Sequence, residues 1–271
     1  MPRVLCGFCE GPEKITNEHV LGEWIGHLWG ARRGGRQMQH THTRDTDTTR
    51  VWQAYRLDQQ VRMACGTCNS GWMHQLEEKV RPIITPMIVP KAAGVRQVSL
   101  DLLSQLLIAT WAVKTAMVAE YLNPPHQRYF VQEERRALMA GGVLPIPGTH
   151  IWVGCFAKEN DGAKGLLAGL VHEPHVVSAH VSVFALGQFT VQVFVERRTA
   201  GYFGNLAVRP GPWDRLLIEV WPPDTRSATP ESIPVWPPPL AFGDDNSLSA
   251  LCNRFLALGA EGMPYHSGSG S

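Results

Sequence analysis

The stretch that decides the fold is ACGTCNSGWMHQLE, Ala64 to Glu77, in which a Cys-x-x-Cys pair leads directly into Asn69 and a helical pattern. Apolar residues then recur at helical spacing along one side, which predicts an amphipathic helix: Trp72, Met73, Leu76 and Val80. Pro82 is expected to end this helix, because proline removes a backbone donor and crowds the preceding turn. The stretch therefore predicts an asparagine held at the start of a short helix, directly after two thiols.

A second Cys-x-x-Cys pair lies in CGFCEGPEKITNEHV, Cys6 to Val20, and is followed closely by Glu18 and His19. Each pair offers two thiolates on one tight turn, and two such turns complete a tetrahedral shell with no open position. This arrangement is typical of a structural Zn²⁺ site, for which the ligands here are Cys6, Cys9, Cys65 and Cys68.

A zinc ion held by these thiols has a geometric consequence for three other residues. It would clamp the segment before Glu18 and His19 against the first turn of the helix that follows Cys68, so that Asn69 approaches both. Histidine can take a proton from water at neutral pH. Glutamate and asparagine supply the hard oxygens that Mg²⁺ accepts. Together they form a minimal set for metal-assisted phosphodiester hydrolysis, with Mg²⁺ or Mn²⁺ as the catalytic ion.

The combined pattern C-x2-C, E-H-V, C-x2-C-N-x-x-W resembles the HNH, or ββα-metal, endonuclease family, in the subset where four cysteines bind structural zinc. The longer string from Leu57 to Ile88 is also similar to uncharacterised HNH-type proteins of high-GC bacteria. The resemblance implies a DNA endonuclease in which His19 is the general base, while Glu18 and Asn69 hold the catalytic metal.

Two features depart from the family pattern. The middle asparagine of the family has only Asp58 and Gln59 as candidates here, and the segment from Val20 to Met63 is long and includes a predicted helix, GEWIGHLWG. These departures keep an alternative open, in which a zinc-stabilised module binds nucleic acid or a protein without catalysis.

The segment between the cysteine pairs is locally basic, although the net charge of the whole chain is only +1. Residues 26 to 62 contain seven arginines and three aspartates. The part rich in Arg, Gly, Thr and His is predicted to be a flexible loop. Within it, Arg32, Arg33 and Arg36 are the predicted nucleic-acid contacts, because arginines there would neutralise backbone phosphates without reading sequence.

The rest of the chain predicts helices followed by strands. The fold class is therefore α+β, with an N-terminal zinc-stabilised ββα-metal module followed by helices and a mainly antiparallel sheet. The predicted divisions are residues 1–84, residues 85–265 and a disordered tail at 266–271. Helices are expected near 99–122, 133–139 and 247–258, and strands near 150–158, 166–173, 180–196 (with a turn at 187–188) and 216–221.

Composition and apolar runs indicate the cellular setting. The chain is 44% hydrophobic, and its longest apolar run, Leu106 to Val113, is far below the roughly 18 residues that span a bilayer. No signal-peptide pattern is present at the start. We therefore expect a cytoplasmic protein with DNA as its partner and no membrane association. In the apolar helix, Lys114 is expected to extend its ammonium group to the surface.

Overall fold

The computed structural model describes most of the chain. The described residues are 4–28, 38–44, 48–54, 59–125, 128–141, 146–157, 163–172, 177–198, 211–223, 233–243, 250–251 and 254.

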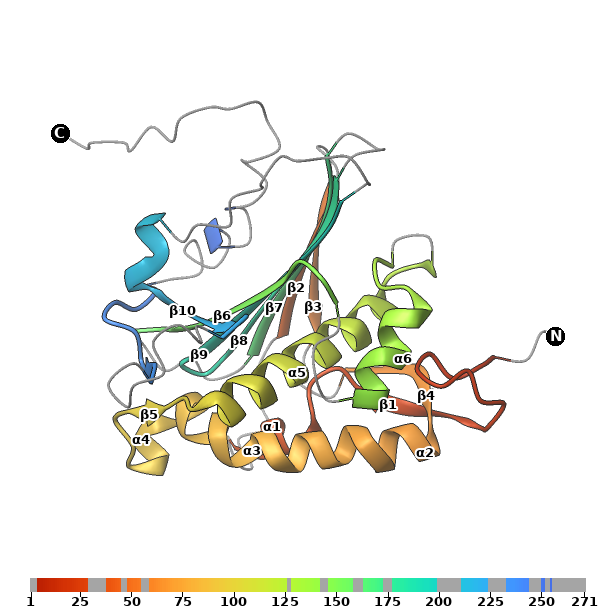
Figure 1. Ribbon diagram of the computed structural model, residues 1–271, viewed down its shortest axis with the longest axis horizontal. Coiled ribbons are helices and arrows are strands. Elements are labelled where there is room, and N and C mark those ends of the chain that lie inside the picture. Colours follow the sequence, from red (N-terminus) through yellow and green to blue (C-terminus); the bar gives the residue numbers. More distant parts are fainter. Residues whose placement is uncertain are drawn as a thin grey trace.

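A seven-stranded sheet is the largest element of the described structure (Figure 1). Its strands pair antiparallel except for β2 and β7, which run parallel. In spatial order they are β10 (Leu217–Trp221), β6 (Thr149–Cys155), β9 (Phe189–Arg198), β8 (Val177–Leu186), β7 (Ala163–His172), β2 (Met38–Arg44) and β3 (Thr48–Ala54).

Two long helices form the layers on one side of this sheet. Figure 1 shows α5 (Leu102–Ala119) lying between the sheet and α3 (His74–Ile88). The position of α5 between two layers explains why its sequence is apolar around most of its circumference, since both faces meet protein. Asp101 caps its start by accepting a hydrogen bond from Ser104 N at 2.8 Å.

The N-terminal part supplies a small antiparallel pair and the beginning of the long helix. β1 (Ile15–His19) pairs with β4 (Gln60–Cys65), with Ile15 opposite Cys65 and His19 opposite Gln60. After β4 the chain enters α2 (Gly66–Cys68), a π-helical turn (Asn69–Met73) and then α3. Figure 1 shows these as one continuous helical run. The paired strands β1 and β4, which α1, β2 and β3 separate in the sequence, are therefore joined directly to a helix and form a strand–strand–helix unit.

Shorter elements complete the described structure. A second small antiparallel pair joins β5 to β11. The shorter elements are α1 (Glu23–His27), α4 (Pro90–Ala93), β5 (Val98–Ser99), a 3₁₀ turn (Glu120–Leu122), α6 (Gln132–Gly141), a 3₁₀ turn (Gly211–Arg215) and β11 (Val235–Trp236).

The α+β class is confirmed, as are the predicted helices near 99–122 and 133–139 and the strands with a turn at 187–188. The expectation that Pro82 ends its helix is wrong, because α3 continues through Pro82 and Pro86 to Ile88. Past Pro82, the side chains of Ile84, Met87 and Ile88 are fully buried. Burial of this face stabilises the helix by more than the lost backbone hydrogen bonds cost.

The expectation of a flexible loop in the Arg-rich stretch at 29–50 is wrong for the part of that stretch that the structure describes. Residues 38–44 and 48–54 form the β2–β3 hairpin, and β2 joins the large sheet by pairing with β7. Strand pairing at a distance, which local composition does not encode, is the reason. Arg32, Arg33 and Arg36 lie outside the described residues.

The core continues across the predicted division at residue 84, which falls within α3. One hydrophobic cluster contains residues from both sides, including Val20, Met63, Trp111 and Val193. Of the predicted helix near 247–258, only residues 250 and 251 are described as helical. The predicted tail at 266–271 lies outside the described residues.

One described helical segment, 102–122, is long and apolar enough by composition to cross a bilayer, with a mean hydropathy of 1.5. However, most of its apolar 18-residue window is buried inside the protein. Its apolar character is therefore accounted for by its place between the sheet and α3.

Candidate metal centre and adjoining polar site

The four predicted zinc ligands lie together. Cys6 and Cys9 come from the N-terminal turn, Cys65 ends β4 and Cys68 lies in α2. Their Sγ atoms all lie within 4.8 Å of one another. The prediction that these four thiols form one cluster, able to hold a metal ion, is thus confirmed.

The thiol spacing fits a tetrahedral zinc ion. With Zn–S bonds of about 2.3 Å, two sulfurs of a tetrahedron are about 3.8 Å apart. Cys9 Sγ and Cys65 Sγ are 3.7 Å apart. All four ligands are thiols, which leaves no ligand position for water, so the ion would act as a structural cross-link.

Backbone donors lower the pKa of one thiol of the cluster, whereas burial raises the pKa of two others. Burial opposes ionisation of Cys6, but N–H groups of Cys9, Cys65 and Phe8 outweigh it and lower the pKa of Cys6 to about 7. Burial raises the pKa of Cys65 to about 11 and also raises the pKa of Cys68. A cation is the partner that makes all four thiolates favourable at once.

The N-terminal turn is packed tightly against the rest of the protein. Gly7 N donates to Met63 O at 2.6 Å, and Gln132 Nε2 from α6 donates to Phe8 O at 2.9 Å. The Phe8 ring meets the Trp72 ring edge-on at a centroid distance of 4.9 Å. The first cysteine pair is therefore fixed by β4, the helix after it and α6.

Asn69, directly after the fourth cysteine, joins the helix to β1. Its Nδ2 donates to Thr16 Oγ1 at 3.1 Å and to Asn17 O at 3.2 Å. Oδ1 accepts no hydrogen bond from any residue in the described part of the chain. The structure thus places Asn69 against β1, the strand that carries Glu18 and His19. Its Oδ1 accepts no hydrogen bond from the described residues and could serve as a metal ligand.

His19 lies at the partly exposed end of β1. Its Nε2 is 2.8 Å from Nε2 of Gln60, the residue opposite it on β4. An amide NH₂ can only donate, so in this orientation the imidazole Nε2 is the unprotonated nitrogen. Asn17 is exposed and shares the strand face of His19, whereas Glu18 points to the other face.

Glu18 is turned toward the interior and is only 7% exposed. Its Oε1 lies 3.7 Å from Nζ of Lys114, which belongs to α5. Burial raises the pKa of Glu18 above its ordinary value, even though the Lys114 ammonium acts in the opposite direction. Of the three predicted catalytic residues, His19 is partly exposed at the end of β1, Asn69 bonds to Thr16 and Asn17 of β1, and Glu18 lies in a buried ionic network.

The expectation that Lys114 reaches the surface is wrong, because this residue has no exposed area. Its Nζ lies 2.6 Å from Oε1 of Glu77, and it is close to Glu18 as well. Burial opposes ionisation of Lys114, but the Glu77 and Glu18 carboxylates outweigh it and raise its pKa. A lysine that cannot reach water is tolerated here because two carboxylates surround it.

Glu77 is the centre of this network. Two indole N–H groups donate to its carboxylate, from Trp24 to Oε2 and from Trp111 to Oε1 at 3.0 Å. Burial alone would raise the pKa of Glu77, but Lys114 and the indole donors outweigh it and lower the pKa. A Cβ at Gly22 would lie 2.5 Å from Oε2 of Glu77, so the turn after β1 also rests on the network.

Comparison with known proteins adds no identification. No family model, curated protein or solved structure matches this chain. The HNH resemblance therefore depends on the cysteine pairs and on the residues around Glu18, His19 and Asn69.

Sequence reasoning missed the network of Glu18, Glu77 and Lys114. A signal was present, because a single lysine lies inside an otherwise apolar helix and a glutamate lies on the helix that carries the core residues Leu76 and Val80. For the middle family position, Gln59 O accepts a hydrogen bond from Val20 N at 2.9 Å, and Asp58 lies outside the described residues.

Proposed function

We propose that the protein is a metal-dependent HNH-type endonuclease that hydrolyses phosphodiester bonds in DNA. The observation that carries the proposal is the hydrogen bonding of Asn69 to β1, beside the four-thiol cluster. It joins the histidine, the amide oxygen and the candidate zinc centre within one strand–strand–helix unit.

In this proposal His19 is the general base. Its unprotonated Nε2 accepts the proton of the attacking water, which takes the place of the Gln60 amide as hydrogen-bond donor. Because the imidazole lies at the partly exposed end of β1, a phosphodiester can approach it from solvent. Gln60 then holds the ring in the productive tautomer when the site is at rest.

Asn69 and Glu18 are the residues that would hold Mg²⁺ or Mn²⁺, and such an ion would supply charge stabilisation at the scissile phosphate. Asn69 suits this role because its Oδ1 is free among the described residues. Glu18 suits it less well, because its carboxylate already faces the Lys114 ammonium. That ammonium would repel a second cation placed beside it.

The pairing of Glu18 with Lys114 favours a second candidate function. If Glu18 serves only the buried network, the module is a non-catalytic, zinc-stabilised unit that binds nucleic acid or a protein. In that case Asn69 and His19 contribute hydrogen bonds to a bound partner.

A plasmid-nicking assay in Mg²⁺ or Mn²⁺ tests the proposal with three proteins. Wild type should nick, and His19→Ala should lower the rate by about 10² or more, the usual contribution of a general base. His27→Ala is the matched control. His27 is exposed, and its loss removes only a weak contact of 4.0 Å with Glu23 on the same helix. Zinc content and melting temperature should be equal in all three.

Two results would reject the nuclease. One is the absence of metal-dependent nicking in pure, zinc-loaded wild type, and the other is full activity in His19→Ala. Calorimetric titration with Mn²⁺ then separates the candidates, since Asn69→Ala should abolish Mn²⁺ binding only if the site holds a catalytic ion.

A further inference from the structure

A cavity of about 480 Å³ is lined by residues outside the cysteine cluster, and no part of the proposed nuclease uses it. Its size is within the range of small-molecule sites, about 300–1,000 Å³. Nine residues line it: Pro90, Lys91, Gly94, Val95, Arg96, Cys155, Gln188, Trp236 and Pro237. They come from α4 and the turn after it, the end of β6, the β8–β9 turn and β11.

The residues that line the cavity carry a net positive charge. Lys91 and Arg96 are both exposed, and neither forms an ion pair with any residue in the described ranges. None of the nine lining residues is acidic. Two cations without a counter-charge at one cavity favour an anionic ligand.

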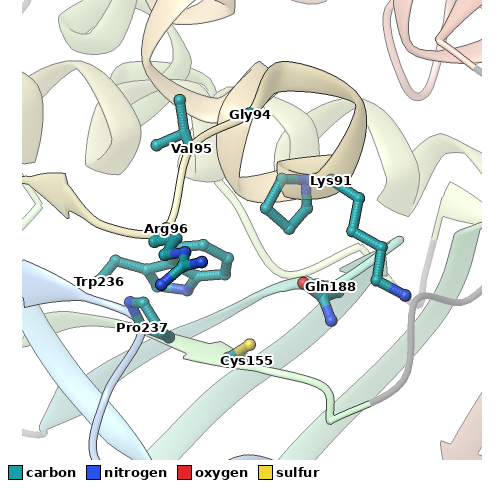
Figure 2. A pocket seen from close by; sticks show the side chains of 9 residues that line it. Lys91, Gly94, Val95, Arg96, Cys155, Gln188, Trp236 and Pro237 are labelled. Carbon is teal, nitrogen blue, oxygen red and sulfur yellow. The ribbon is translucent and has the colours of Figure 1, made fainter.

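The cavity also offers an apolar body and one amide. Figure 2 shows Arg96 beside Trp236 at one end of the cavity and Lys91 at the other end, with Gln188 and Cys155 between them on the side of the sheet. Proline rings and Val95 supply apolar surface, whereas Trp236 is almost fully buried. The Gln188 amide can both donate and accept a hydrogen bond. Burial raises the pKa of Cys155 to about 11, so its thiol stays protonated and is a contact surface, not a nucleophile.

Hydrogen bonds join the segments that line the cavity. Gln188 N donates to Ile88 O at 3.1 Å, and Gln188 O accepts from Phe156 N at 2.9 Å. Trp236 Nε1 donates to Gly154 O at 2.9 Å. Since the segments that carry the lining residues are bonded to one another, a ligand need not order them on binding.

We infer that this cavity binds a small organic anion with a ring body, of the size and chemistry of a mononucleotide. The phosphate contacts Arg96, Lys91 attracts it from the other end of the cavity, the ring lies against the proline and valine surfaces, and Gln188 bonds to the polar edge of the ring. This site is independent of the nuclease chemistry, because its residues are distinct from Glu18, His19 and Asn69.

Isothermal titration of the full chain with adenosine 5′-monophosphate tests the inference, with adenosine and inorganic phosphate as partial ligands. The nucleotide should bind one to one, and at least tenfold more tightly than either partial ligand. Arg96→Gln should weaken nucleotide binding at least tenfold and Lys91→Gln at least threefold. Lys79→Gln, an exposed lysine of α3 outside the cavity lining, should leave the affinity unchanged within twofold.

The two cavity variants change exposed side chains, so their melting temperatures should match wild type. Absence of saturable nucleotide binding would overturn the inference. So would equal affinity for adenosine, or nucleotide binding that Arg96→Gln leaves intact, since the latter would locate the nucleotide elsewhere, the nuclease site included. Nucleotide binding that His19→Ala leaves unchanged would support a site separate from the proposed catalytic residues.

Discussion

Lys114 Nζ and Glu77 Oε1 lie 2.6 Å apart at a point where neither residue has appreciable contact with water. Lys114 belongs to the central helix α5, and Glu77 belongs to the helix that continues from the cysteine cluster. With Glu18 of β1 nearby, this pair ties the strand–strand–helix part to the layer that supports the large sheet. The buried ion pairs therefore connect the strand–strand–helix part to the central helix α5.

Replacing Lys114 by methionine should destabilise the protein strongly. The variant keeps the apolar stem but leaves Glu77 buried without its counter-ion, a change that typically costs about 3–5 kcal/mol. The free energy of unfolding in guanidinium chloride measures the effect. Lys79→Met, on the exposed side of α3, should stay within about 0.5 kcal/mol of wild type. Equal midpoints for Lys114→Met and wild type would show that the pair contributes nothing.

The lowered pKa of Glu77 predicts an acid-dependent loss of stability. Its ionised form stabilises the fold at any pH above its ordinary value of 4.5, and this contribution is lost as pH falls through the lowered pKa of the folded state. Glu77→Gln lacks the contribution. We expect wild type to be more stable than Glu77→Gln at pH 7, and the difference to shrink as pH falls below 4.5. A difference that grows toward low pH would contradict the assignment.

Loss of one thiol should remove the metal ion. Cys65→Ser breaks the four-thiol cluster, so purified protein should contain about one zinc fewer per chain than wild type, and its N-terminal part should unfold more readily. Elemental analysis and chelator-induced changes in tryptophan fluorescence measure both effects. Cys155→Ser, whose thiol lies outside the cluster, should keep its zinc. Zinc loss in both variants would point to general misfolding.

Asn69 should tolerate alanine better than aspartate. Alanine loses two hydrogen bonds to β1, at a cost of about 1–2 kcal/mol, whereas aspartate also puts a carboxylate against the carbonyl oxygen of Asn17. Urea denaturation should therefore rank wild type above Asn69→Ala, and Asn69→Ala above Asn69→Asp. Ser70→Ala is the neighbouring control, because Ser70 Oγ donates to Gly66 O within the same helical run and its loss should change stability little.

Gly187 should not accept a side chain. Its φ is +56°, and a Cβ there would lie 2.2 Å from Ile88 O, so alanine must displace the contact between the β8–β9 turn and the end of α3. We expect Gly187→Ala to lower stability by about 2 kcal/mol or more. Gly141→Ala, with open space around it in α6, should be neutral or slightly stabilising. Thermal unfolding of the two variants gives the comparison.

Local sequence patterns predicted what depends on local physics. The alternating residues of β8 and β9, the apolar run of α5 and the two Cys-x-x-Cys pairs each carry their signal within a short window. The clustering of the four thiols followed from ligand chemistry, which requires four donors around one ion.

What the sequence did not predict depends on partners that are distant along the chain. The burial of Lys114 follows from carboxylates 37 and 96 residues away, which no helical pattern reports. The hairpin of β2 and β3 is part of the large sheet because β2 pairs with β7, more than 100 residues later in the chain. Pro82 does not end α3, because one face of the helix is buried in the core. This tertiary packing outweighs the low helix propensity of proline.

The parallel pairing of β2 with β7 sets an order of events during synthesis. Both cysteine pairs leave the ribosome well before Lys164, the residue that pairs with Gln39. The second edge of β2 therefore stays unpaired until β7 has been translated. The N-terminal turn waits as well, because Gln132 of α6, which donates to Phe8 O, also follows both cysteine pairs in the chain.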